Sequence, residues 1–153
     1  VAALAVLVAV LFMPVLRIYG SSMAPTLNEG EIVVSLKTKN IKPGDVVGVY
    51  YGSKLLIKRC MALDNQWVNI TEDGDVYVDG EIVEEPYIEK KSHGQCDISM
   101  PYQVPENTIF VLGDNRETSV DSRMSTLGCI DKEEVVGKIV FRVWPLNKFG
   151  AIK

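Results

Sequence analysis

The sequence contains few side chains that commonly bind metal ions, with one histidine and three cysteines in 153 residues. Cys60, Cys96 and Cys129 form no C-x-x-C pair and only His93 could join them, so we expect neither a metal site nor another cofactor. Three cysteines allow one disulfide at most, and we expect none. Sixteen Lys and Arg against 20 Asp and Glu give a net charge of −4. A nucleic-acid partner would require a basic face to neutralise its phosphates, and the sequence shows none, so we expect no such partner.

The first 16 residues carry no charge, and Arg17 is the first charged side chain. A helix needs about 20 residues to cross about 30 Å of hydrocarbon, so this run is short by about one turn. Sixteen residues that are apolar on every side nevertheless exceed what a surface helix of a small domain can bury. We therefore interpret residues 1–18 as a truncated membrane anchor in contact with the lipid bilayer. A buried core helix is the alternative, whereas a cleaved signal peptide would need small residues where Pro14–Tyr19 stands.

After Tyr19 the pattern changes from helical to β, without repeats or low-complexity tracts. Asp79-Gly80 between two alternating runs is the clearest hairpin, because both turn positions favour positive φ. Residues 84–107 are polar and proline-spaced, which indicates a long excursion. We expect one all-β domain on one membrane helix, with a β core at 19–63 and 108–153 and an inserted cap with the hairpin at 64–107. Its strands are predicted at 31–36, 46–51, 54–61, 67–70, 76–83, 108–112 and 135–143.

The stretch Gly20–Leu27, GSSMAPTL, follows the apolar run closely. Pro25 fixes its own φ and disfavours helical geometry at Ala24, so we expect a defined bend that can present a serine. Serine beside proline is also ordinary turn chemistry. A serine is moreover a poor nucleophile until a base takes its proton, so a catalytic interpretation requires a base elsewhere in the chain.

Two residues are candidates for that base. His93 lies in a polar loop, with no apolar frame to orient it. Lys58 lies in a predicted strand whose same-face neighbours, Leu56 and Cys60, are apolar. At a pKa of about 10.4 only about one lysine in a thousand is neutral near pH 7, but burial can lower this pKa by several units. A buried Lys58 could therefore act as general base, whereas a lysine with its amine in water could not.

A third segment, Gly113–Arg123, follows a predicted apolar strand. Ser119, Asp121 and Arg123 recur with period 2, so an extended backbone would put all three on one face. Asp121 and Arg123 could then form an ion pair, with Ser119 beside them. The alternative is a solvated loop whose surface ion pair is worth under about 1 kcal/mol.

Together, the three segments resemble the bacterial type I signal peptidases of peptidase family S26, which are membrane-anchored serine proteases with a Ser-Lys dyad. The resemblance implies a signal-peptidase-like (LexA-like) antiparallel β-sheet domain with one N-terminal transmembrane helix. It spans nearly the whole chain, and its motifs are Ser22–Leu27, Lys42–Val47, Lys58–Arg59, Gly113–Arg116 with Ser119–Arg123, Gly137–Lys138 and Trp144–Pro145.

The resemblance assigns roles to individual residues. It implies that Ser22 is the nucleophile, that its backbone N–H binds the oxyanion, and that Lys58 is the general base. Ser119 would orient Lys58, and Asp121 with Arg123 would support the site. Some relatives add a hydroxyl two residues before the nucleophile, where this chain has Gly20. Four residues match family positions near the shallow pockets for an Ala-x-Ala substrate, namely Ile18, Leu27, Leu56 and Ile57. Each of them could instead belong simply to the core.

The resemblance also implies signal peptides of secretory pre-proteins as substrates and an extracytoplasmic domain on a bacterial cell membrane. Trp144 and Phe149 could enter the membrane interface or belong to the core. One departure is Cys60–Asn65, where many relatives have a Gly-x-Pro-Gly-Asp turn, and it puts the local turn in doubt. The alternatives are a self-cleaving repressor, a catalytically idle relative and an anchored binding domain. The first would carry DNA-binding helices, and the second would lack the serine or the lysine.

Overall fold

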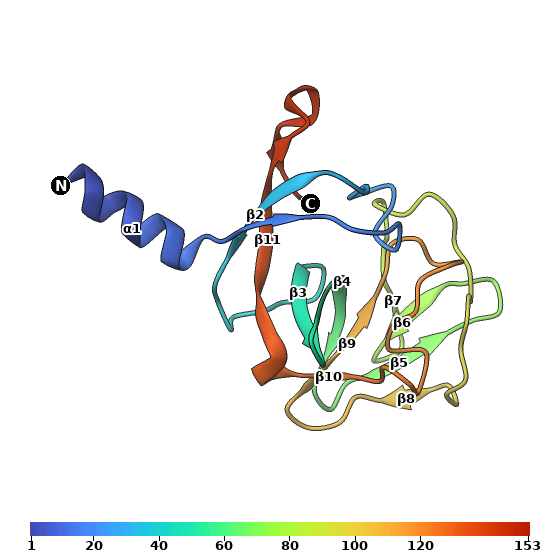
Figure 1. Cartoon of the computed structure of the whole chain (residues 1–153). Coiled ribbons are helices and arrows are strands. Elements are labelled where there is room, and N and C mark those ends of the chain that lie inside the picture. The colour runs from blue at the N-terminus through green and yellow to red at the C-terminus, as the bar shows by residue number, and fades with distance from the viewer.

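The computed structural model describes residues 1–153, and its only α-helix, α1 (Ala2–Phe12), projects away from the β domain (Figure 1). None of its residues is buried. The helix ends before Pro14, because proline offers no N–H and disfavours helical geometry at Met13, whose φ is −128° and ψ is 66°. At 11 residues α1 is shorter than the predicted membrane-spanning helix, and no helix in the structure has the length and apolar character to cross a bilayer.

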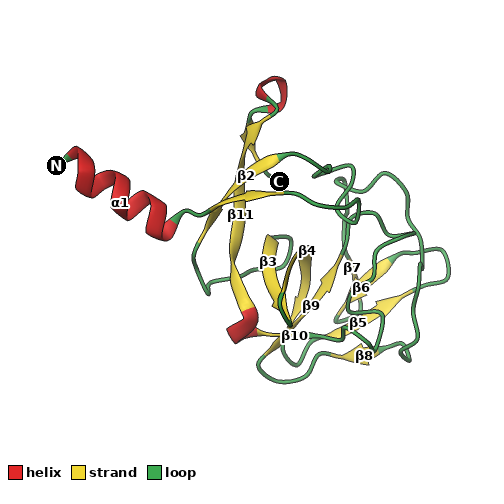
Figure 2. Cartoon of the chain, viewed as in Figure 1, coloured by secondary structure: helices red, strands yellow, loops and turns green.

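The last part of the predicted anchor segment forms an edge strand of the larger sheet. Strand β1 (Val15–Arg17) pairs antiparallel with β2 (Ile32–Leu36). The larger sheet follows the order β1-β2-β11-β3-β4-β9-β10, and β12 pairs with β11 (Figure 2). Its remaining strands are β3 (Val46–Tyr51), β4 (Lys54–Leu63), β9 (Thr108–Leu112), β10 (Ile130–Asp131), β11 (Val135–Trp144) and β12 (Gly150–Ala151), and two 3-10 helices, η1 (Lys132–Glu134) and η2 (Leu146–Lys148), flank β11.

The smaller sheet has the order β7-β6-β5-β8 and lies in the predicted cap region. The predicted hairpin is present, since Asp79 and Gly80 adopt φ of 51° and 81° between β6 and β7. At the position of the departure, β4 continues to Leu63 and the chain turns at Asn65, with φ of 67°. The strands of this sheet are β5 (Trp67–Ile70), β6 (Val76–Val78), β7 (Glu81–Ile82) and β8 (Tyr102–Gln103).

Three buried clusters hold these parts together. One joins the two sheets and includes Phe110 and Leu112 of β9 with Val68 of β5. A second lies on the larger sheet around Val47 and Cys60. The third anchors the bend at residues 20–27 on β2, β3 and β11 and consists of Ile18, Met23, Leu27, Val33, Val46 and Ile139.

Candidate active site

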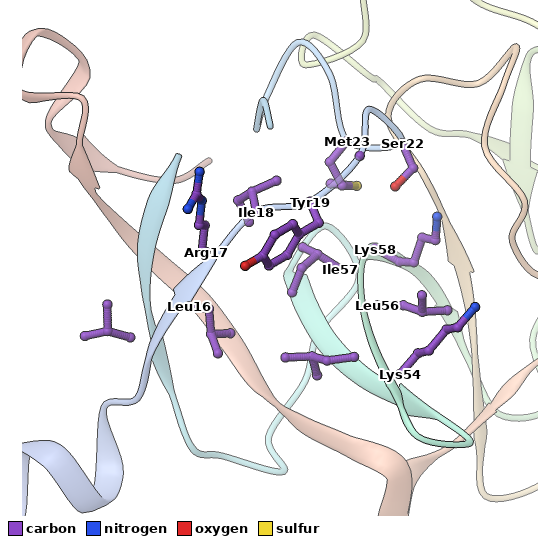
Figure 3. A pocket seen from close by; sticks show the side chains of 13 residues that line it. Leu16, Arg17, Ile18, Tyr19, Ser22, Met23, Lys54, Leu56, Ile57 and Lys58 are labelled. Atoms are coloured by element: carbon purple, nitrogen blue, oxygen red, sulfur yellow. The ribbon is translucent and has the colours of Figure 1, made fainter. Parts of the chain in front are cut away.

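A cavity of about 600 Å³ separates residues 15–23 from residues 54–58 of β4 (Figure 3). Ser22 and Lys58 both line it, and Figure 3 shows the Ser22 hydroxyl and the Lys58 amine directed toward one another. Ile18, Leu56 and Ile57 also line the cavity, whereas Leu27 lies fully buried in the core beside it.

The bend that carries Ser22 is held by contacts on both sides. Met23 and Leu27 are buried, as expected for a turn packed on a core. The Ser22 carbonyl accepts a hydrogen bond of 3.0 Å from the N–H of Asn115, and the Thr26 hydroxyl donates one of 2.5 Å to Asp114. The N–H of Ser22 makes no hydrogen bond within the chain. This donor is therefore free to bind a developing oxyanion.

Lys58 is buried, with 4% of its surface exposed, so the alternative of an amine in water is wrong. Its Nζ donates a hydrogen bond of 3.1 Å to Oγ of Ser119. Burial lowers the pKa of Lys58 below its usual value of 10.5, although the carboxylate of Asp121 acts in the opposite direction. Because the neutral amine is the form that can accept a proton, this environment suits a general base.

Ser119, Asp121 and Arg123 are all buried, so the solvated-loop alternative is also wrong. They lie on a tight, irregular turn and not on the extended backbone that their spacing predicted. Asp121 accepts two hydrogen bonds of 2.8 Å from Arg123 and one of 3.0 Å from the N–H of Gly113. The third side-chain nitrogen of Arg123, Nη1, donates a hydrogen bond of 2.8 Å to the carbonyl of His93, so His93 contributes to this region through its backbone.

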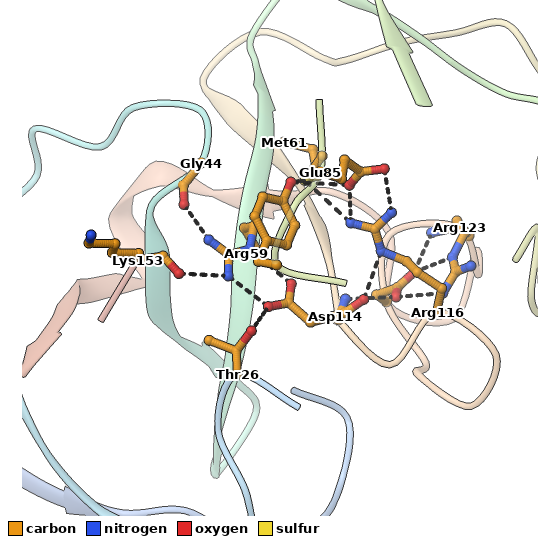
Figure 4. A network of polar contacts seen from close by, with 12 residues as sticks. Thr26, Gly44, Arg59, Met61, Glu85, Asp114, Arg116, Arg123 and Lys153 are labelled. Carbon is orange, nitrogen blue, oxygen red and sulfur yellow. Dashed lines mark hydrogen bonds and ion pairs between the residues drawn. The ribbon is translucent and has the colours of Figure 1, made fainter. Parts of the chain in front are cut away.

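Two further buried ion pairs surround the site and were not predicted (Figure 4). Arg59 donates to both oxygens of Asp114, at 2.9 and 2.7 Å, and Arg116 contacts both oxygens of Glu85. The guanidinium of Arg59 also lies 3.6 Å from the centre of the Tyr87 ring. In the sequence these two arginines look like ordinary solvated surface charges. Their carboxylate partners are distant along the chain, and only the fold brings each pair together. Asp114 thereby links the bend of Thr26 to β4 next to Lys58.

The cysteines and acidic residues provide no further chemistry here. All three cysteines are free, and burial raises the pKa of Cys60 to about 12, which keeps this thiol protonated. No group of three or more His, Cys, Asp or Glu side chains is arranged to hold a metal ion.

Comparison with known proteins identifies the family. The family model described as "Signal peptidase, peptidase S26" matches residues 1–144. The chain belongs to this family. Signal peptidase IB of Staphylococcus aureus (strain COL) is 37% identical over 86% of this chain and 78% of its own, and signal peptidase I of Bacillus licheniformis is 37% identical over 92% and 81%. These relatives confirm the prediction of an enzyme of the signal peptidase I class, a serine endopeptidase.

A solved structure supports the fold assignment. A signal peptidase I from Enterococcus faecalis V583 superposes with a TM-score of 0.55, at 24% sequence identity, over 65% of this chain and 97% of the other. The antiparallel, mostly β, signal-peptidase-like fold that was predicted is therefore confirmed.

Proposed function

We propose that the chain removes N-terminal signal peptides from secretory pre-proteins, with Ser22 as nucleophile and Lys58 as general base. The observation that carries this proposal is the buried amine of Lys58, which lines the same cavity as Ser22 and is bonded to Ser119. That bond orients the amine and leaves its lone pair available to the Ser22 hydroxyl. Asp121 and Arg123 support the turn that carries Ser119.

In the first step, Nζ of Lys58 takes the proton of Ser22 Oγ while Oγ bonds to the carbonyl carbon of the peptide. The backbone N–H of Ser22 then stabilises the negative oxygen, a contribution worth about 10²- to 10³-fold for one donor. Collapse of this tetrahedral intermediate breaks the C–N bond of the peptide, and the ammonium of Lys58 gives its proton to the leaving amine. A water molecule, deprotonated by Lys58, releases the acyl group from Ser22 in the same way.

The two walls of the cavity support binding of an extended peptide. Strand β1 lies at the edge of the sheet, and the N–H and C=O of Tyr19 make no hydrogen bond within the chain. On the other wall, Lys54–Lys58 pair only with β3, because pairing with β9 begins at Arg59. Both walls therefore offer free main-chain groups to an added strand. We place the residues before the cut here, because the large side chains of Ile18, Leu56 and Ile57 line the cavity and would exclude large substrate side chains, as an Ala-x-Ala site requires.

We also propose that the enzyme works at a membrane, with its catalytic domain on the extracytoplasmic side. Helix α1 is apolar and exposed along its whole length. Trp144, Leu146 and Phe149 around η2 are 51%, 71% and 60% exposed, so they are available to a bilayer interface and are not core residues. A vesicle-binding assay tests this assignment. Location at the bilayer would bring the enzyme close to substrates tethered in the same membrane.

Cleavage of a pre-protein with an Ala-x-Ala site tests the function. The purified chain should cut after the second alanine, and Ser22→Ala or Lys58→Ala should each lower kcat by at least about 10³-fold, because nucleophile and base act as a unit. Ser21→Ala is the matched control, since the exposed neighbouring hydroxyl should be dispensable. If Ser22→Ala cuts as fast as Ser21→Ala, the dyad is wrong, and if the unaltered chain does not cut, a catalytically idle relative is favoured.

A further inference from the structure

Lys54 stands at the far end of the cavity from Ser22, on the same strand as Lys58. Alternate residues of a strand share a face, and Figure 3 shows Leu56 between the two lysines. Four residues at about 3.3 Å each separate them by about 13 Å along β4. Unlike Lys58, Lys54 is exposed. The two lysines therefore share a wall of the cavity but differ in hydration.

The charge of this cavity has one sign. Its 13 lining residues include no aspartate or glutamate. Lys54 forms no ion pair within the chain, and neither does Arg17 on the opposite wall, whose guanidinium lies 5.8 Å from the centre of the Tyr19 ring. Lys54 is thus an uncompensated, exposed cation at the end of the cavity that is remote from Ser22, and Arg17 is a second one on the opposite wall (Figure 3).

This inference rests on the proposed function, in which a substrate lies extended along Lys54–Lys58. With the scissile carbonyl at the level of Lys58, one residue of substrate accompanies each residue of β4. The residue level with Lys54 is then about the fifth before the cut. We propose that Lys54 selects substrates with an acidic side chain at that position and disfavours a basic one.

The size of the effect follows from exposure. An ion pair between an acidic substrate side chain and an exposed lysine should raise kcat/KM about two- to fivefold relative to a neutral side chain. A basic substrate side chain should lower kcat/KM by a comparable factor. Substrates that differ only by Glu or Lys at the fifth position should therefore differ about four- to 25-fold in kcat/KM. At about 1 M salt the Debye length falls to about 3 Å, so the ratio should approach one.

Three peptides with one Ala-x-Ala site and Glu, Gln or Lys at the fifth residue before the cut test the proposal. The unaltered chain should cut them in the order Glu, Gln, Lys, and Lys54→Glu should reverse that order. Lys42→Glu is the control, because this exposed lysine lies in a turn outside the cavity and should leave the order unchanged. Equal rates for all three peptides, or an unchanged order in Lys54→Glu, would overturn the proposal and leave the proposed function intact. If none of the three is cut, the proposed function fails and the inference with it.

Discussion

Gly113 directly follows β9 and lies against Ser22 and against Ser119, the hydrogen-bond partner of Lys58. A Cβ at this position would stand 2.1 Å from Oγ of Ser119 and 2.5 Å from the carbonyl oxygen of Ser22, whereas ordinary contacts begin at 3.4 Å. Gly113→Ala therefore forces the partner of Lys58, the backbone of the nucleophile, or both to move by about 1 Å. A displacement of this size at reacting groups costs about 10²-fold in rate. Overpacking of the buried site should cost about 1 to 3 kcal/mol of unfolding free energy.

The assay is kcat/KM for an Ala-x-Ala peptide, measured beside urea unfolding. Gly48→Ala is the matched control, since Gly48 is also a buried glycine of the larger sheet region, in β3, but its Cβ would meet its nearest atoms at 3.6 Å. We expect Gly113→Ala to stay folded and to lose about 10²-fold, and Gly48→Ala to keep its rate. A folded Gly113→Ala with full activity would refute the role given to Ser119 and to the position of Ser22.

Two other predictions concern the ion pairs and the membrane surface. Glu85→Gln leaves the buried charge of Arg116 unpaired and should lower the free energy of unfolding in urea by about 3 to 5 kcal/mol. Glu117→Gln breaks an exposed pair and should cost under about 1 kcal/mol, so equal losses would contradict the account. Leu146→Asp removes an exposed leucine of η2 and should weaken binding to lipid vesicles at least about tenfold, whereas Ser99→Asp on another exposed loop should not. Equal binding of both variants would argue against membrane contact.

Most of the strands could be predicted because their signals are local. The ranges 46–51 and 108–112 coincide with β3 and β9, and the φ values at Asp79-Gly80 are those that the hairpin requires. Strand β1 was missed because its residues continue an uninterrupted apolar run. Pro14 was the available signal, since it ends α1 and sends the chain into the sheet.

In the candidate site, too, the features with a local sequence signal could be predicted and those that depend on tertiary packing could not. Apolar same-face neighbours of Lys58 predicted a dry amine, and the lysine is buried. The period of two in Ser119, Asp121 and Arg123 predicted an extended segment, but hydrogen bonds from Arg123 and Gly113 to Asp121 hold a turn there. The pair Arg116–Glu85 had no local signal, because its members are 31 positions apart and only tertiary packing buries them.

The pH dependence of kcat/KM for an Ala-x-Ala peptide tests the central claim most directly. Activity requires Lys58 without its proton, and burial lowers its pKa from 10.5, so the rate should rise with pH through a midpoint below 10.5 and then level off. A midpoint at or above 10.5, as expected for a hydrated lysine, would contradict the account.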